Sequence, residues 1–133
     1  SHTHEMGDFI SNILNIPGGL PAYLRERILA CAQPGMRYAY IGIAVCSARR
    51  WATYRQMRCK WKRMDELVVL EGEGAGRWIA SLERCGIASL RGLRRDEVQE
   101  AGVPHADFDN KSAGGEGVVP DATRYVLYMV QYF

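Results

Sequence analysis

Three runs of aliphatic, aromatic and β-branched residues constrain the possible folds of this chain more than any other feature. They cover residues 38–45, 67–70 and 125–133. Each run has the composition of a buried strand, and the last is expected at the centre of a sheet. Helical spacing of apolar residues appears between the runs, so the sequence predicts a small α/β domain whose short sheet is flanked by helices.

Helices are predicted where apolar residues recur every three or four positions between turn signals. They are expected over about 21–32, 47–61, 77–85 and 94–101. Pro21 suits a first helical position, Ser47 can act as an N-cap, and Gly86 is placed to end the third helix. The remaining stretches, residues 8–15 and 105–121, are interpreted as a short mixed segment and a loop.

The 133 residues, 47% of them hydrophobic, suit one domain with one core, taken as residues 6–133. Residues 1–5 are interpreted as a cloning remnant or a disordered tail rather than a metal site. The four cysteines form no CxxC pair, which favours free thiols in a reducing compartment. With no membrane-length apolar run and no secretion signal, we expect no membrane association and an intracellular location, in the cytoplasm, nucleoid or nucleus.

The charges are segregated along the chain. Residues 27–63 hold nine basic side chains and no acidic one, whereas the rest of the chain holds eight basic and fifteen acidic side chains. The formal net charge of +2 therefore conceals a strongly basic segment. Such asymmetry favours a polyanionic partner, above all a nucleic-acid backbone, and the alternative is a basic helix face that is merely solvated.

Two charged side chains lie at the border of predicted core stripes. Arg50 shares a helix face with Tyr54 and Trp61, so it is placed to contact a phosphate. The alternatives are that it extends into solvent or pairs with a carboxylate. Glu83 borders the apolar stripe of the next helix and needs a partner, either an arginine or a divalent cation. Glu71 and Glu73 compete with it as metal ligands.

Further motifs follow in a fixed order. Tyr40-Ile41-Gly42 ends a predicted strand, and Arg50 follows eight residues after the glycine. Tyr54 comes four residues later, and an apolar strand then precedes the helix that carries Ala80-Ser81-Leu82-Glu83. Asn110 begins a glycine-rich loop, which can admit a phosphate or simply turn tightly.

This order of motifs, over about residues 38–117, resembles the GIY-YIG nuclease superfamily. The resemblance implies an α/β (α+β) fold with a small, mainly antiparallel central sheet of about three strands flanked by helices. It also implies a metal-dependent DNA endonuclease that hydrolyses phosphodiester bonds with a single Mg²⁺ (or Mn²⁺) and a tyrosine-activated water. The alternative is a catalytically inactive, nuclease-like module that binds nucleic acid.

The resemblance assigns roles to particular residues. Glu83 would hold the metal, Arg50 would stabilise charge on the phosphate, and Tyr40 or Tyr38 would act as the general base. Tyr54 and Asn110 would orient the reacting groups. The predicted contacts to the DNA backbone are Arg49, Arg55, Arg58, Lys60, Lys62, Arg63 and Lys111. Because a single short domain has no separate targeting module, specificity is expected from a homodimer or a larger complex.

One element of the family is missing. Its first strand carries Gly-Ile-Tyr, and no such tripeptide precedes Tyr40. Tyr38 is the favoured substitute, because residues two apart share a strand face. The other alternative is a permuted arrangement in which the C-terminal strand takes the missing strand's place and supplies Tyr125 or Tyr128. In both cases the C-terminal strand is expected in the same sheet.

Overall fold

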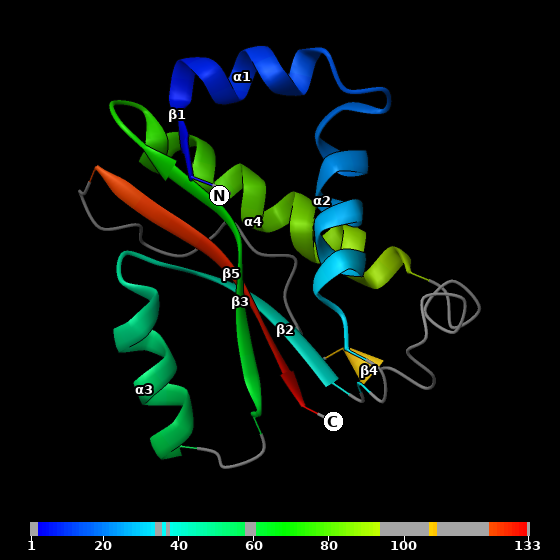
Figure 1. Ribbon diagram of the computed structural model, residues 1–133, viewed down its shortest axis with the longest axis vertical. Coiled ribbons are helices and arrows are strands. Elements are labelled where there is room, and N and C mark those ends of the chain that lie inside the picture. The colour runs from blue at the N-terminus through cyan, green and yellow to red at the C-terminus, as the bar shows by residue number, and fades with distance from the viewer. Residues whose placement is uncertain are drawn as a thin grey trace.

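The computed structural model describes residues 3–33, 36, 38–57, 61–93, 107–108 and 123–132. It contains a mixed sheet in the order β1-β3-β5-β2-β4 with helices on both faces (Figure 1), which confirms the predicted α/β class. The strands are β1 (Thr3–Glu5), β2 (Tyr38–Ala44), β3 (Arg63–Glu71), β4 (Asp107–Phe108) and β5 (Arg124–Tyr132). The helices are α1 (Met6–Leu14), α2 (Gly19–Cys31), α3 (Ser47–Met57) and α4 (Ala75–Gly92).

The three long strands are those that the apolar runs predicted. β5 lies at the centre and pairs antiparallel with both β2 and β3, as expected of the most continuously apolar run. The short edge strands β1 and β4 are additional, and both run parallel to their neighbours. Residues 3–5, within the segment interpreted as a cloning remnant or tail, form the edge strand β1, and His4 Nε2 lies 3.3 Å from the Tyr23 hydroxyl.

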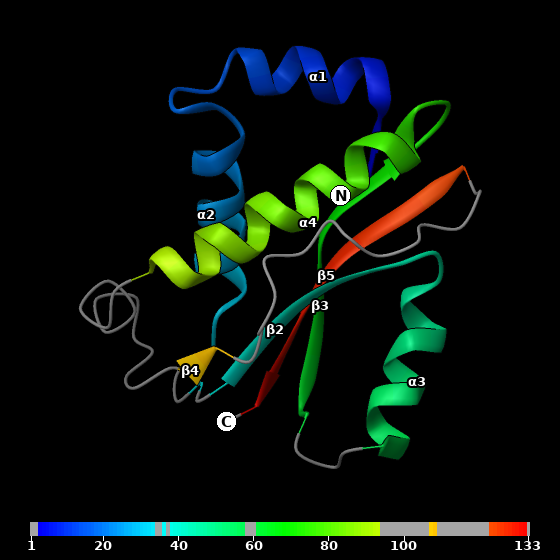
Figure 2. The ribbon, with the colours of Figure 1, turned by 180° about the vertical axis from the view of Figure 1, so that it is seen from behind.

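Alternate residues of β5 divide the core into two layers. Tyr125, Leu127 and Met129 pack with the apolar faces of α1, α2 and α4. Val126, Tyr128 and Val130 lie in the layer on the other side of the sheet, where side chains of α3 pack. In both ribbon views α3 lies apart from the other three helices (Figures 1 and 2). The sheet thus separates α3 from α4.

α4 is longer than the sequence predicted. We expected Gly86 to end the helix, but α4 continues to Gly92 and Gly86 is buried within it. A Cβ at Gly86 would lie 3.6 Å from side-chain atoms of Ile41 and Leu127. The glycine therefore lets the helix pack closely on the sheet, and it does not act as a stop signal.

Other boundaries also differ from the prediction. Residues 6–14 form α1, although residues 8–15 were interpreted as a short mixed segment. The apolar residues of α1 recur at helical spacing, and Met6 and Phe9 among them are buried. α3 ends at Met57, and Trp61 is buried beyond the helix. The predicted helix over 94–101 lies outside the described residues, as does the predicted loop over 105–121 apart from β4.

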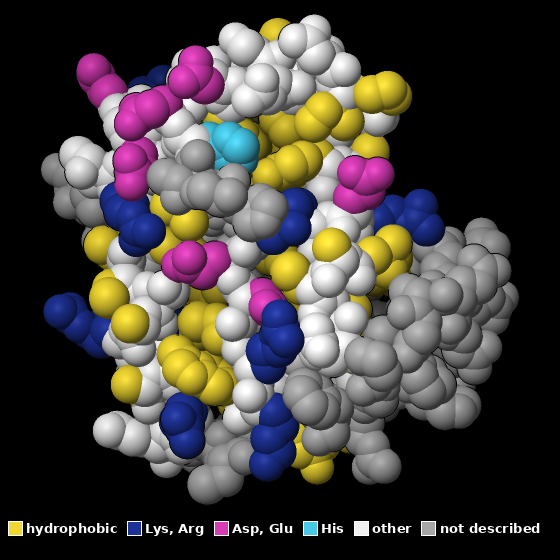
Figure 3. All heavy atoms as spheres, in the orientation of Figure 1, with side chains coloured by type: hydrophobic (Ala, Val, Ile, Leu, Met, Phe, Trp, Pro, Cys, Tyr) yellow, Lys and Arg dark blue, Asp and Glu magenta, His cyan; other side chains and the backbone are white. Residues whose placement is uncertain are grey.

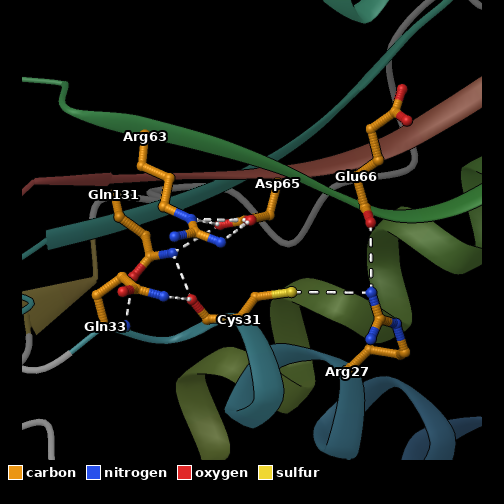
Figure 4. A network of polar contacts seen from close by, with 7 residues as sticks. All are labelled: Arg27, Cys31, Gln33, Arg63, Asp65, Glu66 and Gln131. Atoms are coloured by element: carbon orange, nitrogen blue, oxygen red, sulfur yellow. Dashed lines mark hydrogen bonds and ion pairs between the residues drawn. The ribbon is translucent and has the colours of Figure 1, made fainter.

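A buried polar network joins α2 to the sheet (Figure 4). The side chain of Gln131 is fully buried, and its Oε1 accepts from the backbone N–H of Gln33 at 2.9 Å. Its Nε2 donates to the Cys31 carbonyl and to Asp65 Oδ2, both at 2.9 Å. The network satisfies a polar side chain that would otherwise be costly to bury. Within the described parts of the chain, no helix combines the length and apolar character needed to cross a membrane.

Candidate nucleic-acid interface

Four side chains of the α3 layer form a tyrosine–arginine cluster: Tyr40, Arg50, Tyr54 and Tyr128. Arg50 Nη1 donates to the Tyr128 hydroxyl at 3.3 Å. The hydroxyls of Tyr54 and Tyr128 share a hydrogen bond of 2.9 Å, and the rings of Tyr40 and Tyr54 lie 6.3 Å apart. The cluster therefore joins two of the three long strands to the helix that carries the arginine.

The position of Tyr128 depends on Gly42. The two residues face each other across β2 and β5, and a Cβ built on Gly42 would lie 2.7 Å from Tyr128 Cζ and still closer to its hydroxyl. Any other residue at position 42 would push the phenol ring away. The glycine of the Tyr-Ile-Gly sequence thus has a specific role here, which is to admit the ring whose hydroxyl contacts Arg50.

The cluster combines buried hydroxyls with an exposed cation. Burial raises the pKa of Tyr54 far above its ordinary value, and the neighbouring Tyr128 raises it further. Tyr54 therefore stays protonated throughout the physiological range and acts as a hydrogen-bonding group. The Tyr128 hydroxyl accepts a hydrogen bond from the Arg50 guanidinium and holds it in place. Because Arg50 is exposed, the guanidinium remains accessible to an anion.

The open alternatives for the second tyrosine lie in three different environments. Tyr38 is at the other end of β2, where its ring packs 5.5 Å from that of Tyr132. Tyr125 faces the opposite layer, next to Gly76 of α4. Tyr128 is the tyrosine that contacts Arg50. In the sequence, Tyr128 was one of the two tyrosines that the permuted arrangement offered, and its contact with Arg50 depends on the pairing of β5 with β2.

The predicted metal ligand is carried by another layer. Glu83 is partly buried on α4, on the opposite face of the sheet from α3 and Arg50. Glu71, a competing ligand, pairs with Arg124 at 3.3 Å, and Glu73 is exposed. Among the residues that the structure describes, no group of three or more His, Cys, Asp or Glu side chains is arranged to hold a metal ion. Glu83 and Arg50 are thus not brought together.

The basic side chains predicted to contact DNA include some that are exposed to solvent and one that is held in an ion pair. Arg49, Arg55 and Lys62 are exposed. Arg63 is held by Asp65 through an ion pair of 2.8 Å. In the view of Figure 3, acidic side chains gather toward the α1 end, and basic side chains border the apolar surface toward the α3 end. The predicted residues outside the described parts of the chain are Arg58, Lys60, Asn110 and Lys111.

Arg27 belongs to the basic segment but has a structural role. Its Nε donates to the Leu67 carbonyl at 3.2 Å, and its Nη2 lies 3.4 Å from the Glu66 carbonyl and 3.8 Å from Cys31 Sγ. These bonds attach α2 to β3 (Figure 4). The basic surface available to a polyanion is therefore smaller than the charge count of the segment indicated.

A serine–glutamate pair lies near the cluster and was not predicted. The Ser47 hydroxyl, at the start of α3, donates to Glu66 Oε2 at 2.7 Å. Glu66 lies opposite Tyr128 in the pairing of β3 with β5. No sequence motif indicates this contact, because it depends on how the two strands align.

Comparison of the chain with protein-family models, curated proteins and solved structures found no match. An exposed arginine held by a phenol hydroxyl, with further exposed cations on the same helix, is suited to binding a phosphate group.

Proposed function

We propose that this chain is a GIY-YIG-like DNA endonuclease in which the C-terminal strand replaces the family's first strand. The observation that carries the proposal is the contact of Tyr128 with both Gly42 and Arg50. It joins the Tyr-Ile-Gly strand, the arginine helix and the C-terminal strand in one cluster. β5 lies beside β2 in the centre of the sheet, as the permuted alternative requires.

In this proposal Arg50 binds the scissile phosphate and stabilises the negative charge that develops on it. Tyr128 holds the guanidinium in place, and Tyr54 holds Tyr128. Tyr40 is partly exposed in the same cluster, so it is the tyrosine placed to approach a water molecule as general base. Arg49 and Arg55 on α3 contact the flanking phosphates.

The family resemblance also implies Mg²⁺ (or Mn²⁺) bound by Glu83. A carboxylate is a suitable ligand for either ion, but Glu83 and Arg50 lie on helices at opposite faces of the sheet. The two side chains do not line one site, and we assign no step to a metal held by Glu83.

The proposal is tested by nicking of supercoiled plasmid DNA with and without Mg²⁺. Arg50→Ala should reduce the nicking rate at least 100-fold, in keeping with the loss of one group that stabilises transition-state charge. Arg77→Ala removes an exposed arginine of α4 and serves as the matched control. Equal nicking by wild type and a folded Arg50→Ala protein would contradict the proposal.

A second candidate is a nuclease-like module that binds nucleic acid without cleaving it. The separation of Glu83 from Arg50 favours this alternative. It predicts binding that weakens steeply with salt and no cleavage with any divalent cation. Cleavage that chelator abolishes would eliminate it.

A further inference from the structure

Two tyrosines lie side by side at the end of the sheet where β2 begins and β5 ends (Figure 1). Tyr38 and Tyr132 are directly opposed in the pairing of these strands, and their ring centroids lie 5.5 Å apart at an interplanar angle of 34°. Both side chains are partly exposed, and both pack against the core layer on the α3 side. The two rings therefore present one aromatic surface on that face of the sheet.

The aromatic surface continues along β2 toward the tyrosine–arginine cluster. Tyr40 follows Tyr38 by two residues, so it lies on the same face, and it is also partly exposed. Its ring lies 6.3 Å from that of Tyr54. On the neighbouring strand, four residues separate Tyr132 from Tyr128, which is about 13 Å along β5. The paired rings and the cluster thus belong to one continuous surface.

The charges around this surface are mainly positive. Lys62 is exposed, and its backbone N–H donates to the Gln131 carbonyl at 2.8 Å, which places it next to Tyr132. Glu66 lies on the same face, but its carboxylate already accepts a hydrogen bond of 2.7 Å from Ser47. The adjoining helix α3 contributes three exposed cations: Arg49, Arg50 and Arg55.

Partly exposed rings beside cations are suited to an unpaired nucleic-acid strand. Every base has a π-face that can stack on an aromatic side chain, whereas the bases of a duplex are already stacked on one another. The phosphates of the same strand can bind the neighbouring lysine and arginine side chains. An apolar peptide would use the rings and leave the cations unused, and a DNA duplex would use the cations and leave the rings unused.

We propose that Tyr38 and Tyr132 form a stacking platform for unpaired bases, so that the strand bound at Arg50 is single-stranded DNA or a single-stranded segment of a larger DNA. The inference rests on the proposed DNA endonuclease function and names its substrate class. The strand runs from the platform along β2 and β5, and its phosphate reaches the Arg50 guanidinium.

The experiment measures binding of a fluorescein-labelled oligothymidylate to the intact chain in EDTA by fluorescence anisotropy, beside a labelled duplex of the same length. Tyr38→Leu and Tyr132→Leu should each weaken oligothymidylate binding at least about 5-fold, since each removes a stacking ring, and should change duplex binding by less than about 2-fold. Tyr132→Phe keeps the ring and should bind like wild type. Tyr23→Leu is the matched control, because Tyr23 is a partly exposed tyrosine that packs against the layer on the opposite face of the sheet.

A second measurement needs no variant. Wild type is photocrosslinked to a single-stranded oligonucleotide that carries 5-iodouracil, and the crosslinked peptides are identified by mass spectrometry. Crosslinks should form at residue 38 or residue 132, because a stacked base lies in direct contact with the ring.

The inference would be overturned by unchanged oligothymidylate binding in both leucine variants, by an equal loss of duplex binding, by an equal loss in Tyr23→Leu or Tyr132→Phe, or by crosslinks confined to other residues. Binding in EDTA needs no cleavage, so the two proposals can fail separately. Oligothymidylate binding that depends on the rings, without plasmid nicking, would refute the endonuclease and leave the platform established. Nicking that Arg50→Ala abolishes, together with binding that depends on neither ring, would refute the platform alone.

Discussion

The phenol ring of Tyr128 lies against the backbone of Gly42, too close for a side chain at position 42. This contact decides where the Tyr128 hydroxyl sits, and that hydroxyl binds both Arg50 and Tyr54. A glycine in β2 and a tyrosine in β5 therefore set the position of an arginine on α3.

Replacing Gly42 with Ala should destabilise the protein by about 1–3 kcal/mol, because the new methyl group must displace a fully packed ring. The measurement is the free energy of unfolding in urea. Gly92→Ala makes the same chemical change at a helical position. Among the described residues, nothing outside its own helix backbone and chain neighbours lies within 4 Å of the new Cβ, so it should be neutral or slightly stabilising. Equal effects of the two substitutions would contradict the packing described for Tyr128.

The hydrogen bond between Tyr54 and Tyr128 can be measured by a double-mutant cycle. Tyr128→Phe should lower the free energy of unfolding by about 1 kcal/mol, because it removes the hydroxyl that hydrogen-bonds to both Arg50 and Tyr54. Once Tyr128 is Phe, Tyr54→Phe should cost less than it does in wild type. Additive costs would show that the two hydroxyls do not interact in solution.

The raised pKa of Tyr54 predicts a loss of stability in alkali. A tyrosine whose pKa is higher in the folded state binds its proton more tightly there, so its stabilising contribution is complete below the ordinary tyrosine pKa of about 10. The contribution declines as the pH rises beyond that value, because ionisation then favours unfolding. Wild type should therefore lose stability above pH of about 10 more steeply than Tyr54→Phe, as followed by urea unfolding at several pH values. Parallel pH profiles would contradict the prediction.

Gln131→Glu tests the buried polar network. The substitution places a second carboxylate against Asp65, whose Oδ2 now accepts a hydrogen bond of 2.9 Å from the glutamine amide. Repulsion should destabilise the variant by about 1–3 kcal/mol at pH 7. Because the two carboxylates repel each other, one of them then has a raised pKa and is protonated as the pH falls. The loss of unfolding free energy relative to wild type should therefore shrink at lower pH. Gln131→Met lacks the second charge, so its loss of unfolding free energy relative to wild type should be the same at each pH.

DNA binding should distinguish the two kinds of arginine. Arg55→Ala should weaken binding to any DNA sequence, because Arg55 is exposed on α3. The slope of the logarithm of the binding constant against the logarithm of the salt concentration should become shallower by about one, since one phosphate contact is lost. Arg63→Ala should have a smaller effect, since Asp65 already binds that guanidinium at 2.8 Å. Fluorescence anisotropy with a labelled duplex at several salt concentrations measures both. A larger effect of Arg63 would contradict the assignment of the α3 surface.

Much of the fold followed from local patterns. The three apolar runs became β2, β3 and β5, and the central position of β5 was expected from its continuous apolar character. The predicted helix end was wrong where one residue type has two structural uses. Gly86 resembles a helix stop, yet its lack of a side chain serves close packing of α4 on Ile41 and Leu127. Sequence spacing cannot distinguish these two uses of glycine.

The sequence by itself determined the three long strands, the charge asymmetry and the placement of Arg50 and Tyr54 on one helix surface, because each depends on residues close together in the chain. Only the tertiary structure decided that Tyr128 is the tyrosine beside Arg50, that Glu66 shares their face, and that Glu83 does not. Those relationships depend on strand order, on the register of β5, and on which side of the sheet each helix covers. Contacts between residues far apart in the chain set all three, and no local pattern records them.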